Sequence, residues 1–134
     1  MTISHYSLGA LLSALLAALA APAAAQEFSA PSGLRLHLND VVMEMEAGIA
    51  RFRFVAPSID PTGDAVPYEA VAGDFSWLCE TLALPALLAN EAVVGQVVIS
   101  IADREVQFGA ADAEATQFFE SYVVDGETCV WEAF

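Results

Sequence analysis

The sequence predicts an α+β domain, in which an antiparallel sheet of about six strands, built from hairpins, has one amphipathic helix packed on a face. Three observations lead to this fold. Several segments alternate apolar with polar residues, as half-buried strands do. Residues 68–82 instead repeat their apolar positions with the period of a helix. Asp125-Gly126 separates two alternating segments and is typical of a hairpin turn.

The first strand is predicted over residues 34–38, where leucine alternates with polar residues. The apolar phase changes at Asn39-Asp40, because Val41 and Met43 are the next apolar positions. A slip of one residue exchanges the two faces of a strand, so this change predicts a bulge or a tight turn.

A hairpin is predicted over residues 41–56, with a two-residue turn at Ala47-Gly48. This register places apolar positions opposite one another and Glu44 opposite Arg51. Arg51 is therefore interpreted as one half of a surface ion pair rather than as an anion-binding residue.

The helix is predicted over residues 68–82, after Pro67 and before Pro85, with a short second helix over residues 85–91. Upstream, residues 57–67 form a loop. Part of that loop, residues 60–64, faintly resembles a calcium-binding loop, but it lacks the alternating oxygen ligands, and an ordinary turn is favoured. The apolar face of the helix contains Tyr68, Val71, Phe75, Leu78, Cys79 and Leu82.

The remaining strands follow the helices. Residues 93–101 are apolar on both faces, as in a central strand. A turn at Asp103-Arg104 predicts a second hairpin that pairs this strand with residues 106–108. A third hairpin spans residues 118–134 around Asp125-Gly126.

The N-terminal 25 residues are predicted to be a secretory signal peptide, cleaved between Ala25 and Gln26. A leucine and alanine segment ends in small residues just after Pro22, although no Lys or Arg precedes it. An uncleaved anchor over residues 6–25 is the alternative, but alanine is only weakly apolar. Cleavage predicts a periplasmic or secreted protein with no membrane span after cleavage.

After cleavage the chain would consist of a flexible lead-in (residues 26–33) and a single domain (residues 34–134). Its formal net charge is −14, and it has no lysine. Nucleic acid and anionic membranes need a positive surface and are excluded as partners. The carboxylates are spread along the chain, which fits either a cationic partner or simple solubility.

Two cysteines, Cys79 and Cys129, lie in the mature part, and there is no C-x-x-C motif. In an oxidising compartment they predict one disulfide, with Cys129 on a strand opposite Tyr122. Closing a loop of about 50 residues would stabilise the fold by about 4 kcal/mol in the chain-entropy model.

No residue pattern indicates a catalytic site, and no cofactor or metal is predicted. His37 is the only histidine of the mature chain and lies on the polar side of a strand, which favours a surface role over a catalytic one. Zinc would need more His or Cys ligands, and without lysine there is no Schiff base. Only a pair of carboxylates could support hydrolysis.

Six segments of the mature part resemble those of known proteins: Ile49-Ala-Arg-Phe-Arg-Phe-Val-Ala-Pro57, Trp77-Leu-Cys-Glu-Thr81, Leu84-Pro85, Gln96-Val-Val-Ile-Ser-Ile-Ala-Asp-Arg104, Ala115-Thr-Gln-Phe-Phe-Glu120 and Cys129-Val-Trp-Glu132. Through these segments the chain resembles a family of small exported bacterial proteins of unknown function, over most of its mature part. The resemblance implies no activity. Such chains sometimes receive an acetolactate synthase label, which nothing here supports, because thiamine-diphosphate enzymes are several times longer.

The leading hypothesis is a non-enzymatic, exported domain that binds or supports a protein or another component of the envelope. The alternative is a small carboxylate-dependent hydrolase, which would need two acids at the floor of a cleft. Weak calcium binding by the acidic surface is a third hypothesis.

Overall fold

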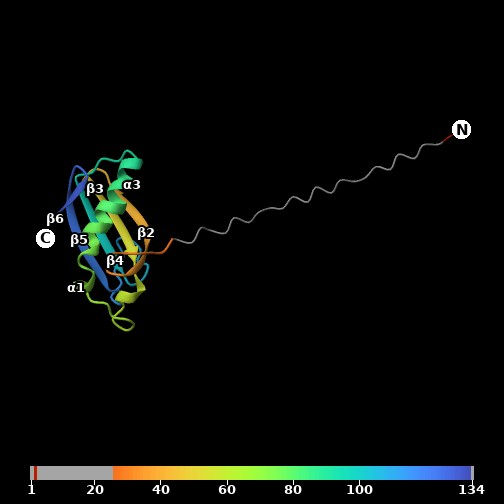
Figure 1. The fold of residues 1–134 in the computed structure, drawn as a ribbon, viewed down its shortest axis with the longest axis vertical. Helices are drawn as coiled ribbons and strands as arrows, with labels where there is room; N and C mark the ends of the chain where they lie inside the picture. The colour runs from red at the N-terminus through yellow and green to blue at the C-terminus, as the bar shows by residue number, and fades with distance from the viewer. Residues whose placement is uncertain (1, 3–25, 134) are drawn as a thin grey trace.

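The computed structural model describes Thr2 and residues 26–133, so all of the predicted signal peptide except Thr2, and its cleavage site at Ala25, lie outside the described residues. Six strands form one curled sheet, in chain order: β1 (Phe28–Ser29), β2 (Arg35–Glu44), β3 (Ile49–Val55), β4 (Gln96–Ala102), β5 (Gln117–Asp125) and β6 (Thr128–Glu132) (Figure 1). The helical segments lie between β3 and β4: η1 (Pro57–Ile59), α1 (Tyr68–Val71), α2 (Asp74–Leu78), the π-helical η2 (Cys79–Ala83) and α3 (Leu84–Ala89). The predicted α+β class is confirmed.

The sheet is antiparallel except at its centre, where β3 and β4 run parallel. Parallel neighbours need a long crossover, and the helical residues between β3 and β4 supply it. The expectation of a fully antiparallel sheet is corrected at this point.

The second predicted hairpin, with a turn at Asp103-Arg104, is wrong. β4 pairs instead with β5, and residues 103–116 form an irregular connection between them. The buried carboxylate of Asp103 accepts hydrogen bonds from Arg104 Nε (3.0 Å) and from the backbone N–H of Thr116 (3.2 Å). Because buried carboxylates need such partners, Asp103 holds the two ends of the connection together.

β2 and β3 pair across a four-residue turn, with Glu44 opposite Ile49 instead of Arg51. The predicted register is therefore wrong by two residues. A shift by an even number leaves every side chain on its predicted face. The predicted bulge is confirmed by the register shift between Leu38 and Asp40.

β5 and β6 pair across a two-residue turn at Gly126-Glu127, one residue later than predicted. Gly126 has a φ of +60°, a conformation that favours glycine, and it takes the first position of the turn. As a result Cys129 lies opposite Val124, and the predicted pairing with Tyr122 is wrong.

The helical segments α2, η2 and α3 follow one another directly from Asp74 to Ala89, so the predicted end of the helix at Pro85 is wrong. The N–H of Leu84 donates to the carbonyl of Cys79, five residues back, which is a π-helical bond. Proline lacks the N–H that the α-helical ladder requires. The wider π turn just before Pro85 relieves that loss and lets the helix continue.

The helices and strands share one buried core. The predicted apolar face of the helix contributes to it, with Tyr68 and Leu82 partly buried and the other four residues buried. Cys79 on η2 forms a disulfide with Cys129 on β6, with 6.2 Å between their Cα atoms. Large core residues from the strands include Leu36, Phe52, Phe54, Ile99, Ile101 and Tyr122.

Part of the predicted lead-in is ordered in the sheet, because Phe28 and Ser29 form β1. Just after it, the backbone N–H of Ser32 (3.0 Å) and the Ser32 hydroxyl both donate to the carboxylate of Asp74. Asp74 is buried at the start of α2, so this contact ties the β1–β2 turn to the helix.

Candidate functional site

The side chains of β3, β4 and β5 that alternate with the core residues point to the opposite face of the sheet. On β3 these are Arg51 and Arg53, and on β4 they include Val98 and Ser100. Phe119 on β5 faces the same way, opposite Ser100. Because strand residues i and i+2 share a face, the Arg-Phe-Arg segment places both guanidinium groups on this side.

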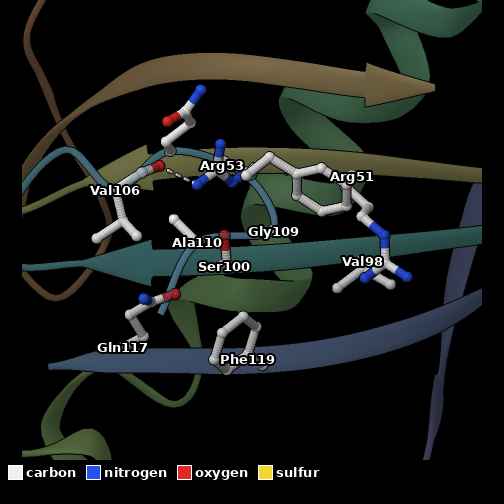
Figure 2. Close-up of a pocket in the computed structure, with 11 residues that line it drawn as sticks. Arg51, Arg53, Val98, Ser100, Val106, Gly109, Ala110, Gln117 and Phe119 are labelled. Atoms are coloured by element: carbon white, nitrogen blue, oxygen red, sulfur yellow. Dashed lines mark hydrogen bonds between the residues drawn. The ribbon is translucent and has the colours of Figure 1, made fainter. Parts of the chain in front are cut away.

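The connection between β4 and β5 covers part of this face and forms a pocket of about 260 Å³. Figure 2 shows the connection through Val106, Gly109 and Ala110 in front of the strands, with Ser100 and Phe119 beside it. We name this the open-face pocket; its lining residues are Arg51, Arg53, Val98, Ser100, Val106, Gln107, Phe108, Gly109, Ala110, Gln117 and Phe119.

Arg53 is the structural anchor of the open-face pocket. Its Nη1 donates to both carboxylate oxygens of Asp40 (2.9 and 2.7 Å), and its Nη2 donates to the carbonyl of Val106. Its side chain is only 13% exposed. The bonds to Asp40 join β3 to β2, and the bond to Val106 holds the connection against the sheet, so both terminal nitrogens of Arg53 are used.

Arg51 is more available than Arg53. Its Nε donates to Glu44 (3.0 Å), but its two terminal nitrogens have no hydrogen-bond partner among the described residues. The guanidinium carbons of Arg51 and Arg53 lie 5.8 and 5.6 Å from the centroid of the Phe108 ring. The ring therefore stabilises both cations and holds Arg51 beside the pocket.

Two neutral polar side chains complete the open-face pocket. Within the part of the chain that the structure describes, neither the Ser100 hydroxyl nor the Gln117 amide takes part in a side-chain hydrogen bond, and both side chains line the pocket. Its lining, as far as the described residues form it, contains no carboxylate. It combines unused donors from Arg51, Ser100 and Gln117 with the apolar surfaces of Phe108 and Phe119.

Of the residues that the sequence singled out, Arg51 lines the open-face pocket, whereas His37 and the loop of residues 60–64 lie outside it. His37 is half-buried on β2 opposite Val55. Asp60 accepts hydrogen bonds from the N–H (2.9 Å) and hydroxyl (2.8 Å) of Thr62, and these bonds lower the pKa of the Asp60 carboxyl. This is an ordinary turn. Among the described residues, no cluster of three or more His, Cys, Asp or Glu side chains could hold a metal.

The sequence reasoning missed a buried carboxylate, Glu120 on β5. It accepts hydrogen bonds from the Tyr68 hydroxyl and from the indole Nε1 of Trp131 (2.6 Å). The hydrogen bond to Glu120 raises the pKa of Tyr68. No periodic pattern identifies Glu120, because it occupies a core-facing position of β5, opposite Ile99, where apolar residues normally lie.

A second cavity of about 520 Å³ lies between α3 and the β5–β6 turn, and it is mostly apolar. Two acids, Glu80 and Glu127, line it. Glu80 accepts the backbone N–H of Cys129 (3.1 Å), which holds β6 beside the helix.

Comparison with known proteins assigns the family. A family model described as a family of unknown function (DUF6497) matches residues 12–134. The chain belongs to DUF6497. This confirms the resemblance found in the sequence. No curated protein and no solved structure matches the chain. In the part of this DUF6497 chain that the structure describes, no helix is long and apolar enough to span a membrane.

Proposed function

We propose that this DUF6497 protein is an exported, non-enzymatic binding domain, and that its open-face pocket holds a small group with an anionic and an apolar part on another envelope component. The observation that carries the proposal is the guanidinium of Arg51, whose terminal nitrogens line this pocket with no hydrogen-bond partner among the described residues. The chain has four arginines, no lysine and a net charge of −14, yet two of the four arginines line this one pocket.

The chemistry of the pocket supports an amphipathic anion. The terminal nitrogens of Arg51 form a planar fork, which matches the geometry of a carboxylate or phosphate. Phe108 and Phe119 offer apolar surface beside that fork, and Ser100 and Gln117 offer neutral donors. Sites of this composition bind ligands by shape and a few placed polar groups.

Export is supported by two features. The signal-like N-terminal sequence predicts secretion, and the Cys79–Cys129 disulfide fits an oxidising compartment. A binding role is supported by the composition of the open-face pocket, which offers hydrogen-bond donors beside apolar surface.

The test is calorimetric titration with phenylacetate, an anion with an aromatic ring, and with phenethylamine as its cationic counterpart. For a ligand of this size we expect a dissociation constant on the order of 1 mM for phenylacetate, about −4 kcal/mol. Phenethylamine should bind at least tenfold more weakly.

Arg51→Gln should weaken phenylacetate binding about tenfold, because it removes the charged fork. The matched control is Arg35→Gln, since Arg35 is an exposed arginine paired with Glu27 outside the pocket. Equal binding of the two probes, or an equal effect of the two substitutions, would contradict the proposal.

A further inference from the structure

Most of the outer edge of β2 has no neighbouring strand among the described residues. β2 is ten residues long, but β1 pairs with it only at Arg35 and Leu36. Within the described residues, no strand pairs with that edge beyond Leu36. Its backbone N–H and C=O groups therefore form a template for an added strand.

Apolar side chains follow this edge. Leu38, Val41 and Met43 align with the core-facing residues of β3, yet they are 37%, 40% and 37% exposed. Phe52, which lies opposite Val41, is 3% exposed. The core is thus uncovered along β2, and a strand with apolar residues at alternate positions would cover it.

On the face of the sheet opposite Val41 and Met43, β2 carries acidic side chains. Asp40 and Glu44 have side chains that are 43% and 35% exposed, and each forms an ion pair with an arginine of β3. Lysine or arginine on an added strand would lie beside these carboxylates as favourable cross-strand pairs. Charge complementarity therefore selects a basic segment.

A second copy of the chain fits this edge poorly. Two β2 edges paired antiparallel about Val42 would place Asp40 opposite Glu44, and like charges directly opposite are destabilising. Each copy also has a net charge of −14. The residues that remain after the bulge, from Asp40 to Glu44, suit a short strand from a different protein.

We propose that the Asp40–Glu44 edge of β2 binds an extended, basic segment of a partner protein by strand addition. Apolar residues of that segment cover Val41 and Met43, and its Lys or Arg residues face Asp40 and Glu44. This edge adjoins the open-face pocket through the Asp40–Arg53 and Glu44–Arg51 ion pairs. Met43 aligns with the core-facing Ala50 and does not line the pocket, so a substitution of Met43 tests strand addition independently of the pocket.

The test uses the full oxidised protein and a dye-labelled seven-residue peptide in which valine and lysine alternate, followed by fluorescence anisotropy. Two N-methylated versions, one modified at the valines and one at the lysines, test for strand addition. Only alternate N–H groups of an added strand point to its neighbour. One version should keep its affinity within about twofold, and the other should lose about tenfold.

Met43→Thr should weaken peptide binding severalfold, because it removes an apolar contact while keeping strand propensity. Val93→Thr is the matched control, since Val93 is 88% exposed and lies outside the strands. Hydrogen exchange should show new protection in residues 40–44. Equal binding of both N-methylated peptides, or protection at β6 instead, would overturn the proposal. Phenylacetate binding should be the same in Met43→Thr as in the wild type.

Discussion

Arg51 donates only its Nε to Glu44 (3.0 Å), so the terminal fork of its guanidinium stays available at the open-face pocket. The sequence predicts this Arg51–Glu44 ion pair, and the structure confirms it. The sequence pattern does not reveal that the pair leaves the two terminal nitrogens of Arg51 unused. The spacing of Arg51 and Arg53 does place two cations on one face of a strand. Phe108 could not be added from sequence, because it arrives from an irregular connection.

At the same scale, Glu120 is predicted to contribute to stability. Glu120→Ala leaves the Tyr68 hydroxyl and the Trp131 indole without their acceptor, and we expect a loss of about 1–3 kcal/mol in the free energy of unfolding. Glu120→Gln should recover part of this loss, because its amide oxygen can still accept one bond. Urea unfolding measures both.

The control for Glu120 is Glu114→Ala, at a side chain that is 87% exposed. It should change stability by less than about 0.5 kcal/mol. Equal losses in Glu114→Ala and Glu120→Ala would show that the hydrogen bonds of Glu120 contribute nothing.

Tyr122 is predicted to make the fold sensitive to alkali. Burial, and secondarily the charge of Glu120, raises the pKa of Tyr122 above its ordinary value. Below pH ~10 the Tyr122 hydroxyl keeps its proton in both the folded and unfolded states, so its titration does not lower the free energy of unfolding. Above that pH the unfolded chain releases the proton first, and stability falls by up to about 1.4 kcal/mol per pH unit.

The Tyr122→Phe variant tests this pH dependence. Phenylalanine does not titrate, so the fall in stability above pH ~10 should become shallower in urea unfolding curves. An unchanged slope in the variant would show that Tyr122 does not control the alkaline transition.

At the scale of the elements, alternation in the sequence predicted faces but not registers. The bulge at Asn39 was predictable because the apolar phase changes there. The β2–β3 register was not, because alternation is equally satisfied by shifts of two residues. The predicted hairpin between residues 93–101 and 106–108 is wrong. Ile99 and Ile101 could be aligned with the nearby apolar residues Val106 and Phe108, but their partners lie on β5, after a long connection.

The disulfide is the prediction that belongs to this scale, since it joins η2 to β6. The double variant Cys79→Ala with Cys129→Ala should lose about 4 kcal/mol of unfolding free energy in the chain-entropy model. Differential scanning calorimetry at neutral pH measures the loss. Reducing agent should lower the melting temperature of the wild type but not of the double variant. A wild type that is insensitive to reductant would argue against a stabilising bridge.

At the scale of the whole molecule, the main prediction is export, and it rests on the N-terminal 25 residues. The N-terminal sequence of the exported form should begin at Gln26, because small residues after Pro22 suit signal peptidase. Edman sequencing or intact mass of the protein from culture supernatant or periplasm measures this. A form that begins at Met1 or Thr2 would contradict cleavage.

The central claim is that the open-face pocket binds an amphipathic anion, and a nuclear magnetic resonance titration of the oxidised protein with phenylacetate tests it most directly. We predict saturable shifts of backbone amides at Ser100, Phe108 and Phe119, which line the pocket, with much smaller shifts for phenethylamine. Shifts confined to the second cavity between α3 and the β5–β6 turn, or no saturable shifts at all, would contradict the claim.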